Sequence, residues 1–380
     1  MILGIDASNI KNSGGLKHLF EFLNHIEPQK FGIERILLFG GNQLDELPNA
    51  VWLEKRKENL LVQNSFLKES FWKIIKAEKI FLSMCDIIFA PGGTFYSKKI
   101  FYISMSQNML VFEKKEANRY GLSWIRLRLY ILNFLQSRSL NNALGVIFIS
   151  QYARDYITSF SKININKSKN IYFGSSDNFK FLIKEQKKIS TYTEKNRYKI
   201  LYVSIIDLYK HQDKLVNAIS QLYKKGYPVE LTLVGPIYKP YFKKFETALS
   251  KIDNNAEFIK YLGQVNYNKV SKIYKEADMF VFASTCENMP NILIEAMSAG
   301  LPIACSNYGP MPEFLQDAGE YFDPLNVDSI VKAIEKLMLN PELRYENAQK
   351  AYNFTQQLSW QKCANETLEF IVSCYQNDKP

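Results

Sequence analysis

The chain has 380 residues, enough for two domains of ordinary size, and its 47% hydrophobic and 23% charged residues exclude a disordered protein. Five scattered cysteines without a Cys-x-x-Cys pair argue against zinc or a disulfide framework, and three dispersed histidines form no evident metal site. The net charge of +10 favours solubility, an anionic membrane surface or an anionic ligand over nucleic acid, because no nucleic-acid-binding module is visible.

Strands and helices alternate in the first part of the chain. The expected strands are Ile2–Ile5, Arg35–Phe39, Asp86–Ala90, Ile100–Met105 and Gly145–Ile149, with an amphipathic helix over Leu16–Ile26. The alternation predicts a parallel sheet with crossover helices. The strand-like start has no basic region of a signal peptide, and no apolar run reaches the ~18 residues of a membrane-spanning helix. A cytoplasmic location is expected.

A second series of strands and helices begins near residue 198. Its expected strands are Tyr198–Val203, Val229–Val234, Glu257–Tyr261, Met279–Ala283 and Pro302–Ser306. Its expected helices are Gln212–Tyr223, Tyr267–Glu276, a segment from Pro290 to Gly300, and Val327–Leu339. The polar stretch Lys184–Lys199 marks the linker between the two series.

The two series predict an α/β protein of two doubly wound domains that face each other across a cleft. The first domain is expected over residues 1–178 and the second over 179–358. A last helix, about 359–380, carries Trp360, Leu368 and Ile371 on one face and needs a surface to cover.

One basic segment of the first domain, Arg119–Arg138, mixes arginines with aromatic and aliphatic residues. Leu122, Ile125, Leu129 and Leu132 follow helical spacing. The segment fits a core helix with solvated arginines, the favoured interpretation, or a helix that meets an anionic membrane surface.

The most informative stretch is Ser284–Pro302, in which Glu287 and Glu295 stand eight residues apart. The apolar run before it reads as a buried parallel strand, and Pro290 suits the first position of the helix that follows. Glu287 is therefore expected on the loop at the carboxyl end of a strand, and Glu295 about one turn into the helix. Ligands bind at this end of open α/β sheets.

An anion is expected at the start of this helix. The N–H groups of Asn291 to Leu293 would lack intrahelical acceptors and suit a phosphate. Ionised Glu287 and Glu295 can only accept hydrogen bonds, so they would bind hydroxyls beside the phosphate. A phosphate flanked by diols describes a nucleotide-sugar.

With its surroundings, this segment resembles the Glu-x7-Glu signature of the retaining glycosyltransferases of family 4, which have the GT-B fold of two Rossmann-like domains. The resemblance extends over much of the second domain and reaches the last helix, which in that family crosses back onto the first domain. The first domain resembles the family mainly through Gly14 and Gly15. The stretches that carry the resemblance in the second domain and last helix are Leu201–Lys210, Leu233–Gly235, Tyr261–Val265, Ala277–Asp278, Glu287–Pro302 and Leu358–Trp360.

The resemblance implies a role for each matching residue. Glu287 would hold hydroxyls of the donor sugar, Glu295 the ribose diol, and Lys210 would neutralise the departing diphosphate. Gly14 and Gly15 would let the first strand–helix loop approach that diphosphate. Main-chain groups would bind phosphate and sugar at Met289, Pro290, Asn291, Ile292 and Leu293, and the base would lie against Gly263, Gln264 and Val265.

Three departures from the family pattern bear on the site. Ile205 stands where the family often has an arginine, so one expected cation is missing. Asn288 replaces the usual glycine, and its amide could meet the donor sugar. No histidine follows the middle strand of the first domain; Asn108 is the substitute we assign to catalysis, although it also suits a turn.

The sequence thus predicts a retaining hexosyltransferase that needs no metal, since the chain has no Asp-x-Asp motif, and no other cofactor. The donor would bind the second domain, and a saccharide or lipid-linked saccharide acceptor would bind the first. The enzyme would act in polysaccharide biosynthesis, peripherally on the inner face of the membrane. Two alternatives stay open: a catalytically weak partner subunit, motivated by Ile205 and the missing histidine, and a sugar-nucleotide epimerase.

Overall fold

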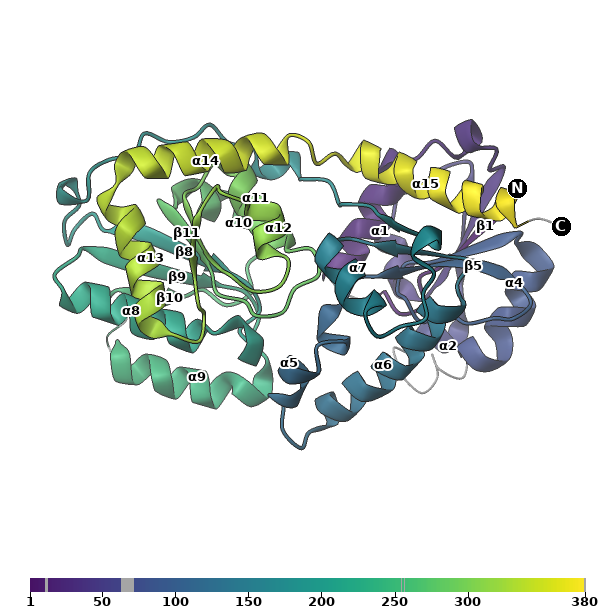
Figure 1. Ribbon diagram of the computed structural model, residues 1–380, viewed down its shortest axis with the longest axis horizontal. Helices are drawn as coiled ribbons and strands as arrows, with labels where there is room; N and C mark the ends of the chain where they lie inside the picture. Colours follow the sequence, from purple (N-terminus) through teal and green to yellow (C-terminus); the bar gives the residue numbers. More distant parts are fainter. Residues whose placement is uncertain (11–12, 63–71, 254, 256, 379–380) are drawn as a thin grey trace. The chain divides into compact units, whose positions relative to one another are not determined.

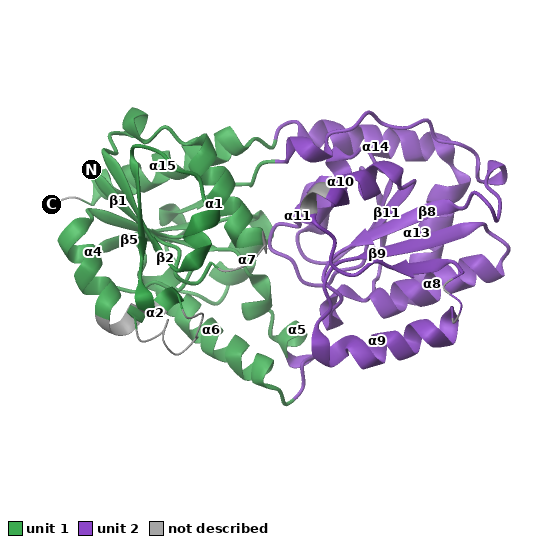
Figure 2. Cartoon of the chain, turned by 180° about the vertical axis from the view of Figure 1, so that it is seen from behind, with its two compact units in different colours: residues 1–117, 122–174, 358–380 green, residues 118–121, 175–357 purple. Residues whose placement is uncertain are grey.

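The structure is a computed structural model that describes residues 1–10, 13–62, 72–253, 255 and 257–378. The chain divides into two compact units (Figures 1 and 2). Unit 1 comprises Met1–Ala117, Leu122–Gly174 and Leu358–Pro380, and unit 2 comprises Asn118–Gly121 and Ser175–Gln357.

Unit 1 is built on a seven-stranded parallel sheet in the order β3-β2-β1-β4-β5-β6-β7. The strands predicted from continuous apolar runs are confirmed as five of its members. Two polar strands, β3 and β7, were not predicted. The strands are β1 (Ile2–Asp6), β2 (Arg35–Gly40), β3 (Leu53–Lys57), β4 (Ile87–Ala90), β5 (Phe101–Ser106), β6 (Gly145–Phe148) and β7 (Ser168–Asn170).

Helices flank this sheet, as its parallel connections require (Figure 1). The predicted amphipathic helix is confirmed as the first of them. They are α1 (Ser13–His25), α2 (Asn59–Val62), α4 (Glu78–Met84), α5 (Lys114–Asn118), α6 (Trp124–Asn142), α7 (Gln151–Thr158) and the C-terminal α15 (Trp360–Asn377).

The C-terminal helix α15 packs against α1 of unit 1, as the sequence predicted (Figure 1). At its start, Trp360 stacks on Phe173, and Phe173 stacks on His18 of α1 with ring centroids 4.4 Å apart. A Cβ on Gly174 would lie 2.2 Å from the Trp360 nitrogen, so only glycine fits there. These aromatic contacts fix the last helix to the first domain.

The burial of His18 gives the stability of this unit a pH dependence. Desolvation lowers the pKa of His18 from its usual 6.5 to about 3. Between these values the unfolded chain binds a proton that the folded chain does not, so stability falls as pH falls from 6.5 towards 3, by about 1.4 kcal/mol per pH unit. We expect His18→Leu to flatten this slope between pH 6.5 and 5, measured as urea midpoints. An equal slope in both proteins would contradict the assignment.

Unit 2 is built on a six-stranded parallel sheet in the order β10-β9-β8-β11-β12-β13. Its five predicted strands are confirmed, and the short edge strand β13 adds a sixth. The strands are β8 (Tyr198–Val203), β9 (Val229–Val234), β10 (Ile259–Tyr261), β11 (Met279–Phe282), β12 (Ile303–Ser306) and β13 (Glu320–Phe322).

The helices of unit 2 cover both faces of this sheet (Figure 2). Four were predicted, and α9, α12 and α14 were not. The helices are α8 (Gln212–Lys224), α9 (Lys239–Ile252), α10 (Tyr267–Glu276), α11 (Asn291–Ser298), α12 (Met311–Leu315), α13 (Val327–Leu339) and α14 (Pro341–Thr355).

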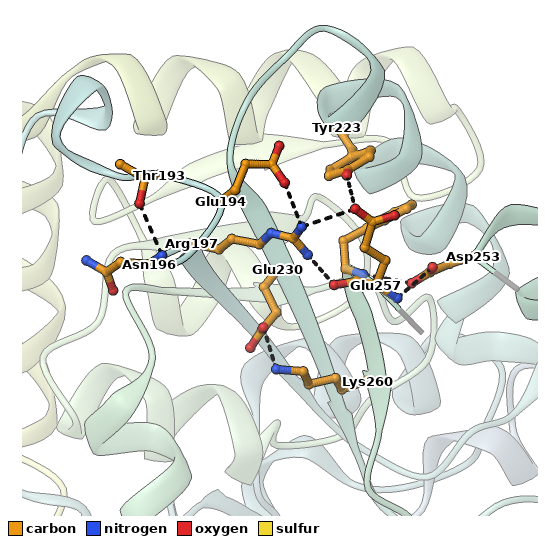
Figure 3. Close-up of polar contacts among 10 residues, drawn as sticks. Thr193, Glu194, Asn196, Arg197, Tyr223, Glu230, Asp253, Glu257 and Lys260 are labelled. Atoms are coloured by element: carbon orange, nitrogen blue, oxygen red, sulfur yellow. Dashed lines mark hydrogen bonds and ion pairs between the residues drawn. The ribbon is translucent and has the colours of Figure 1, made fainter. Parts of the chain in front are cut away.

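A polar network joins the strands of unit 2 near their amino ends (Figure 3). Arg197, directly before β8, forms ion pairs with Glu194 and Glu257. Lys260 of β10 pairs with Glu230 of β9. This network lies away from the carboxyl ends of the strands, and its Glu230–Lys260 pair provides a control for the functional tests below.

Candidate active site

The chain reverses its direction of travel across the unit 2 sheet between β8 and β11. From β8 it proceeds outward to β9 and β10; it then returns to β11 on the other side and proceeds to β12 and β13. The loops that follow β8 and β11 therefore leave neighbouring strands in opposite directions. Such a switch point opens a crevice at the carboxyl ends of the strands, where α/β proteins bind ligands.

The loop after β8 presents Lys210. The side chain of Asp207 accepts a hydrogen bond from the Leu208 N–H, which starts a short 3₁₀ turn over Leu208–Lys210. Tyr202 of β8 donates its hydroxyl to the Lys210 carbonyl at 2.8 Å. His211 then adopts a left-handed φ of 51°, after which α8 begins at Gln212.

The loop after β11 presents Glu287, and its carboxylate forms an ion pair with the Lys210 ammonium. The Lys210 side chain is 6% exposed and that of Glu287 16%, so both charges are largely removed from water. The Lys210 ammonium also lies 5.0 Å from the ring centre of Tyr209 and 5.3 Å from that of Phe282. Removing either side chain would leave an unpaired buried charge, which strongly destabilises the folded protein.

A hydrogen-bonded tie holds the two loops together. The Thr285 N–H donates to the Tyr209 carbonyl at 2.9 Å, and the Thr285 hydroxyl donates to the same carbonyl at 3.2 Å. His211 Nε2 lies 3.1 Å from that hydroxyl and completes the tie as donor. His211 is buried. The left-handed backbone turns its ring inward against the neighbouring loop.

This tie sets the position of Lys210, because Thr285 contacts the residues on either side of it. We expect Thr285→Val to raise the KM for the donor about fivefold, since one hydrogen bond contributes about 1 kcal/mol. Thr285→Ser keeps the hydroxyl and should restore a near-normal KM. Steady-state kinetics of both variants, with melting temperatures as a folding check, measures this. A Ser variant as impaired as the Val variant would contradict the role of the hydroxyl.

Helix α11 begins beside Glu287. Pro290 caps this helix rather than occupying its first position, which shifts the predicted start by one residue. The Asn291 N–H donates to the Met289 carbonyl at 2.9 Å and is therefore engaged, contrary to prediction. The first turn still directs the N–H groups of Ile292 and Leu293 towards the start of the helix, with the positive end of its dipole. Asn288 and Met289 are buried, and Glu295 is half-buried on the second turn.

The loop after β10 carries Gly263, Gln264 and Val265. Gly263 has a left-handed φ of 66°, and its carbonyl accepts the Gly235 N–H at 2.8 Å from the loop after β9. Gln264 is exposed and Val265 is half-buried. This loop leaves the same edge of the sheet as Lys210 and Glu287, two strands further out from β8.

In unit 1 the structure places Gly14 and Gly15 in the first turn of α1, not on the loop after β1. This corrects the expected position, although the loop itself includes residues outside the described part of the chain. A Cβ at Gly14 would meet nothing within 4 Å, so packing alone does not require that glycine. Asn108 is exposed, and its side chain accepts the Leu110 N–H at 3.0 Å as a cap. Its catalytic role stays a prediction.

Two residues near Lys210, Asp207 and Thr285, were not predicted from the sequence. Asp207 is buried, and desolvation raises the pKa of its carboxyl, while hydrogen bonds from the Leu208 N–H and the Tyr120 hydroxyl oppose the rise. Tyr120 lies in the short Asn118–Gly121 segment that belongs to unit 2. Thr285 gives no signal of a functional role, because a threonine after a buried strand is common. The turn-forming preference of Asp207 was the one available hint.

Neither a metal-binding cluster nor a membrane-spanning helix is found where the structure describes the chain. Its described residues contain no group of three or more His, Cys, Asp or Glu side chains that could hold a metal ion. Within the same residues, no helix is both long and apolar enough to span a bilayer. Independence of metal stays a prediction.

The sequence of this site has known relatives. Residues 183–354 match the family described as glycosyl transferases group 1. The matched stretch lies within unit 2 and contains Lys210, Glu287 and Glu295. It supports a glycosyltransferase.

Curated relatives of the chain agree with that match. O-antigen chain mannosyltransferase B of Escherichia coli is 33% identical over 111 residues, 29% of each chain. The chain thus spans less than a third of that relative. A protein of Haemophilus influenzae described as an uncharacterized glycosyltransferase is 22% identical over 96% of this chain and 98% of its own.

Solved structures show the fold of the chain. Sucrose-phosphate synthase from Thermosynechococcus elongatus matches with a TM-score of 0.76 over 100% of both chains at 15% identity. Anabaena HepE in complex with UDP-glucose matches with a TM-score of 0.70 over 98% of this chain and 99% of its own, at 17% identity. The predicted fold, GT-B with two Rossmann-like domains, is confirmed. The arrangement of the two domains about a cleft stays a prediction.

Proposed function

We propose that this chain is a retaining family 4 glycosyltransferase that moves a hexose-type sugar from a nucleotide-sugar to an acceptor hydroxyl without a metal. The observation that carries the proposal is the buried Lys210–Glu287 pair at the switch point of unit 2, beside the start of α11. A cation, a carboxylate and a helix N-terminus together match the diphosphate and hydroxyls of such a donor.

Each part of the donor has a place in this proposal. The diphosphate lies at the first turn of α11 and draws on the Lys210 ammonium. The carboxylate of Glu287 accepts hydrogen bonds from the donor sugar, and Glu295 accepts them from the ribose. The base lies against the loop Gly263–Val265, which leaves the same edge of the sheet.

The reaction breaks the bond between the anomeric carbon and the diphosphate. The acceptor oxygen attacks from the same face and passes its proton to the departing phosphate, so no separate general base is required. Negative charge grows on the diphosphate as the bond breaks, and a preorganised cation and helix dipole stabilise that charge. Lys210 is suited to this task because its loop already holds it in place.

The relatives support a donor class and a pathway. The activity in each name is that of the relative and comes to this chain only as a proposal. HepE binds UDP-glucose, and the Escherichia coli relative is a mannosyltransferase of O-antigen chains. We therefore propose a hexose carried on a nucleoside diphosphate as donor. The acceptor is a saccharide or lipid-linked saccharide in surface-polysaccharide biosynthesis. The chain would act in the cytoplasm, peripherally on the inner face of the membrane.

One observation favours a second candidate, a partner subunit with weak catalysis of its own. Ile205 stands where the family often has an arginine, and it is half-buried beside the β8 loop. A donor could then bind without efficient transfer. A sugar-nucleotide epimerase has the same fold but no specific residue in its favour.

Release of free nucleoside diphosphate from a panel of donors, with and without acceptor and with Glu287→Ala, tests the proposal. Acceptor-dependent release that Glu287→Ala abolishes supports the transferase. Binding without acceptor-dependent release would favour the partner subunit, and an altered sugar still joined to its nucleotide would favour the epimerase.

A further inference from the structure

Helix α6 of unit 1 has an inward face of mixed polar and apolar side chains. Its buried residues are Leu129, Gln136, Ser139 and Leu140. The Tyr102 hydroxyl donates to the Ser139 carbonyl at 2.8 Å, and Asn133 donates to the Val111 carbonyl at 3.0 Å. The predicted inward positions Ile125 and Leu132 are half-buried, whereas Leu122 precedes the helix and is exposed. Of the large apolar side chains of α6, four are exposed. Two are buried, Leu129 and Leu140, and four are half-buried: Ile125, Ile131, Leu132 and Leu135.

The outward face carries the larger apolar side chains instead. Trp124 is 66% exposed, Leu127 51%, Tyr130 45% and Phe134 64%. Their spacing of three, three and four residues places them along one side of the helix, which we call the outer stripe. A water-soluble surface rarely groups large apolar side chains in this way, and such a group marks a binding surface.

The sequence segment that contains the outer stripe carries charge of a single sign. No aspartate or glutamate occurs between Glu116 and Asp155, whereas five arginines do: Arg119, Arg126, Arg128, Arg138 and Arg154. Arg126 lies one turn before Tyr130, with its guanidinium 5.6 Å from the ring centre. Arg138 lies 3.9 Å above the Tyr96 ring. Aromatic and aliphatic side chains flanked by arginines fit the boundary between lipid headgroups and acyl chains.

We propose that the outer stripe of α6 docks onto an anionic phospholipid bilayer, with its apolar side chains among the acyl chains and its arginines at the headgroup phosphates. The proposal rests on the membrane association in the proposed function. It adds the surface through which the chain binds the membrane and the charge of the lipid. From Trp124 to Phe134 the stripe is about 15 Å long, so the helix lies in the interface and does not cross it.

A second copy of the chain fits the same surface poorly. A symmetric pair brings the same patch of both copies together. The arginines of one stripe would then face those of the other, with no carboxylate within Ala117–Arg154 to compensate. An anionic bilayer carries charge opposite to that of the arginines.

Trp124 provides a direct probe of docking. The other tryptophans are less accessible, because Trp72 and Trp360 are buried and Trp52 is half-buried. The full chain is mixed with vesicles of phosphatidylcholine alone or of phosphatidylcholine with an equal amount of phosphatidylglycerol. We expect a blue shift of fluorescence and quenching by brominated acyl chains with the anionic vesicles only, both reversed by high salt.

A double variant tests the stripe itself. Leu127→Glu with Phe134→Glu should lower vesicle partitioning at least tenfold, because two apolar side chains that each contribute about 1.5–3 kcal/mol when buried are replaced by anions. Phe242→Glu with Leu339→Glu changes two exposed apolar residues of unit 2 and should leave partitioning unchanged. Equal binding to neutral vesicles, unchanged partitioning of the stripe variant, or self-association through the stripe without lipid would overturn the proposal.

Binding of nucleoside diphosphate, measured on the same samples without vesicles, separates this proposal from the proposed function. The stripe variant should bind nucleoside diphosphate as the unmodified chain does. A chain that docks on anionic vesicles but binds no nucleoside diphosphate would refute the transferase and keep the docking surface. The reverse result would refute the docking surface alone.

Discussion

Replacing Glu287 by Gln is expected to lower kcat/KM for sugar transfer by about 10²-fold, the equivalent of about 2.7 kcal/mol. The substitution keeps the shape of the side chain but removes the charge that, in the proposed function, accepts hydrogen bonds from the donor sugar. It also leaves the Lys210 ammonium, 6% exposed, without its carboxylate. The rate of nucleoside diphosphate release with saturating acceptor measures the effect.

Glu230→Gln is the matched control for this prediction. Glu230 is 15% exposed and pairs with Lys260, so it resembles Glu287 in burial and partner. It lies in β9 near the amino end of the sheet. Its variant should retain at least half of the activity. If both variants lose activity equally, the loss reflects general damage to unit 2 rather than the donor site.

Replacing Lys210 by Met is expected to weaken binding of nucleoside diphosphate about tenfold to a hundredfold, since a charge-assisted contact to phosphate contributes about 1.5–3 kcal/mol. Methionine keeps an unbranched side chain but removes the ammonium that lies 5.3 Å from the ring centre of Phe282. The transfer rate should fall further than the affinity, because the charge on the leaving group grows as the bond breaks. Calorimetric titration gives the affinity and single-turnover kinetics gives the rate.

Lys260→Met serves as the comparison and should bind nucleoside diphosphate normally. Combining Lys210→Met with Glu287→Gln should destabilise the fold less than the sum of the single changes, because the pair then leaves no unpaired buried charge. Strictly additive urea midpoints would show that the two side chains do not interact in solution.

The fold was predictable where the sequence carries continuous apolar runs. Met279–Phe282 is buried on both faces, so every residue of the strand is apolar. The edge strand Leu53–Lys57 was not predicted, because an edge strand is exposed to water along one side. Its residues are largely charged, so it has no continuous apolar run. The short Ser168–Asn170 strand was missed for the same reason.

Part of the site was predictable because its signals are local. The order of strand, Glu287, proline and helix lies within one short stretch of sequence. The Lys210–Glu287 pair joins residues 77 positions apart, and only the pairing of β8 with β11 brings them together. The inward place of His211 was not predictable, because its left-handed backbone has no signature in a single histidine.

A crystal structure of the chain with a bound nucleoside diphosphate tests the central claim most directly. We expect density for the diphosphate at the first turn of α11, within hydrogen-bonding distance of the Lys210 ammonium, with the ribose hydroxyls at Glu295. A diphosphate bound elsewhere, with the Lys210–Glu287 pair undisturbed and the start of α11 unoccupied, would contradict the account.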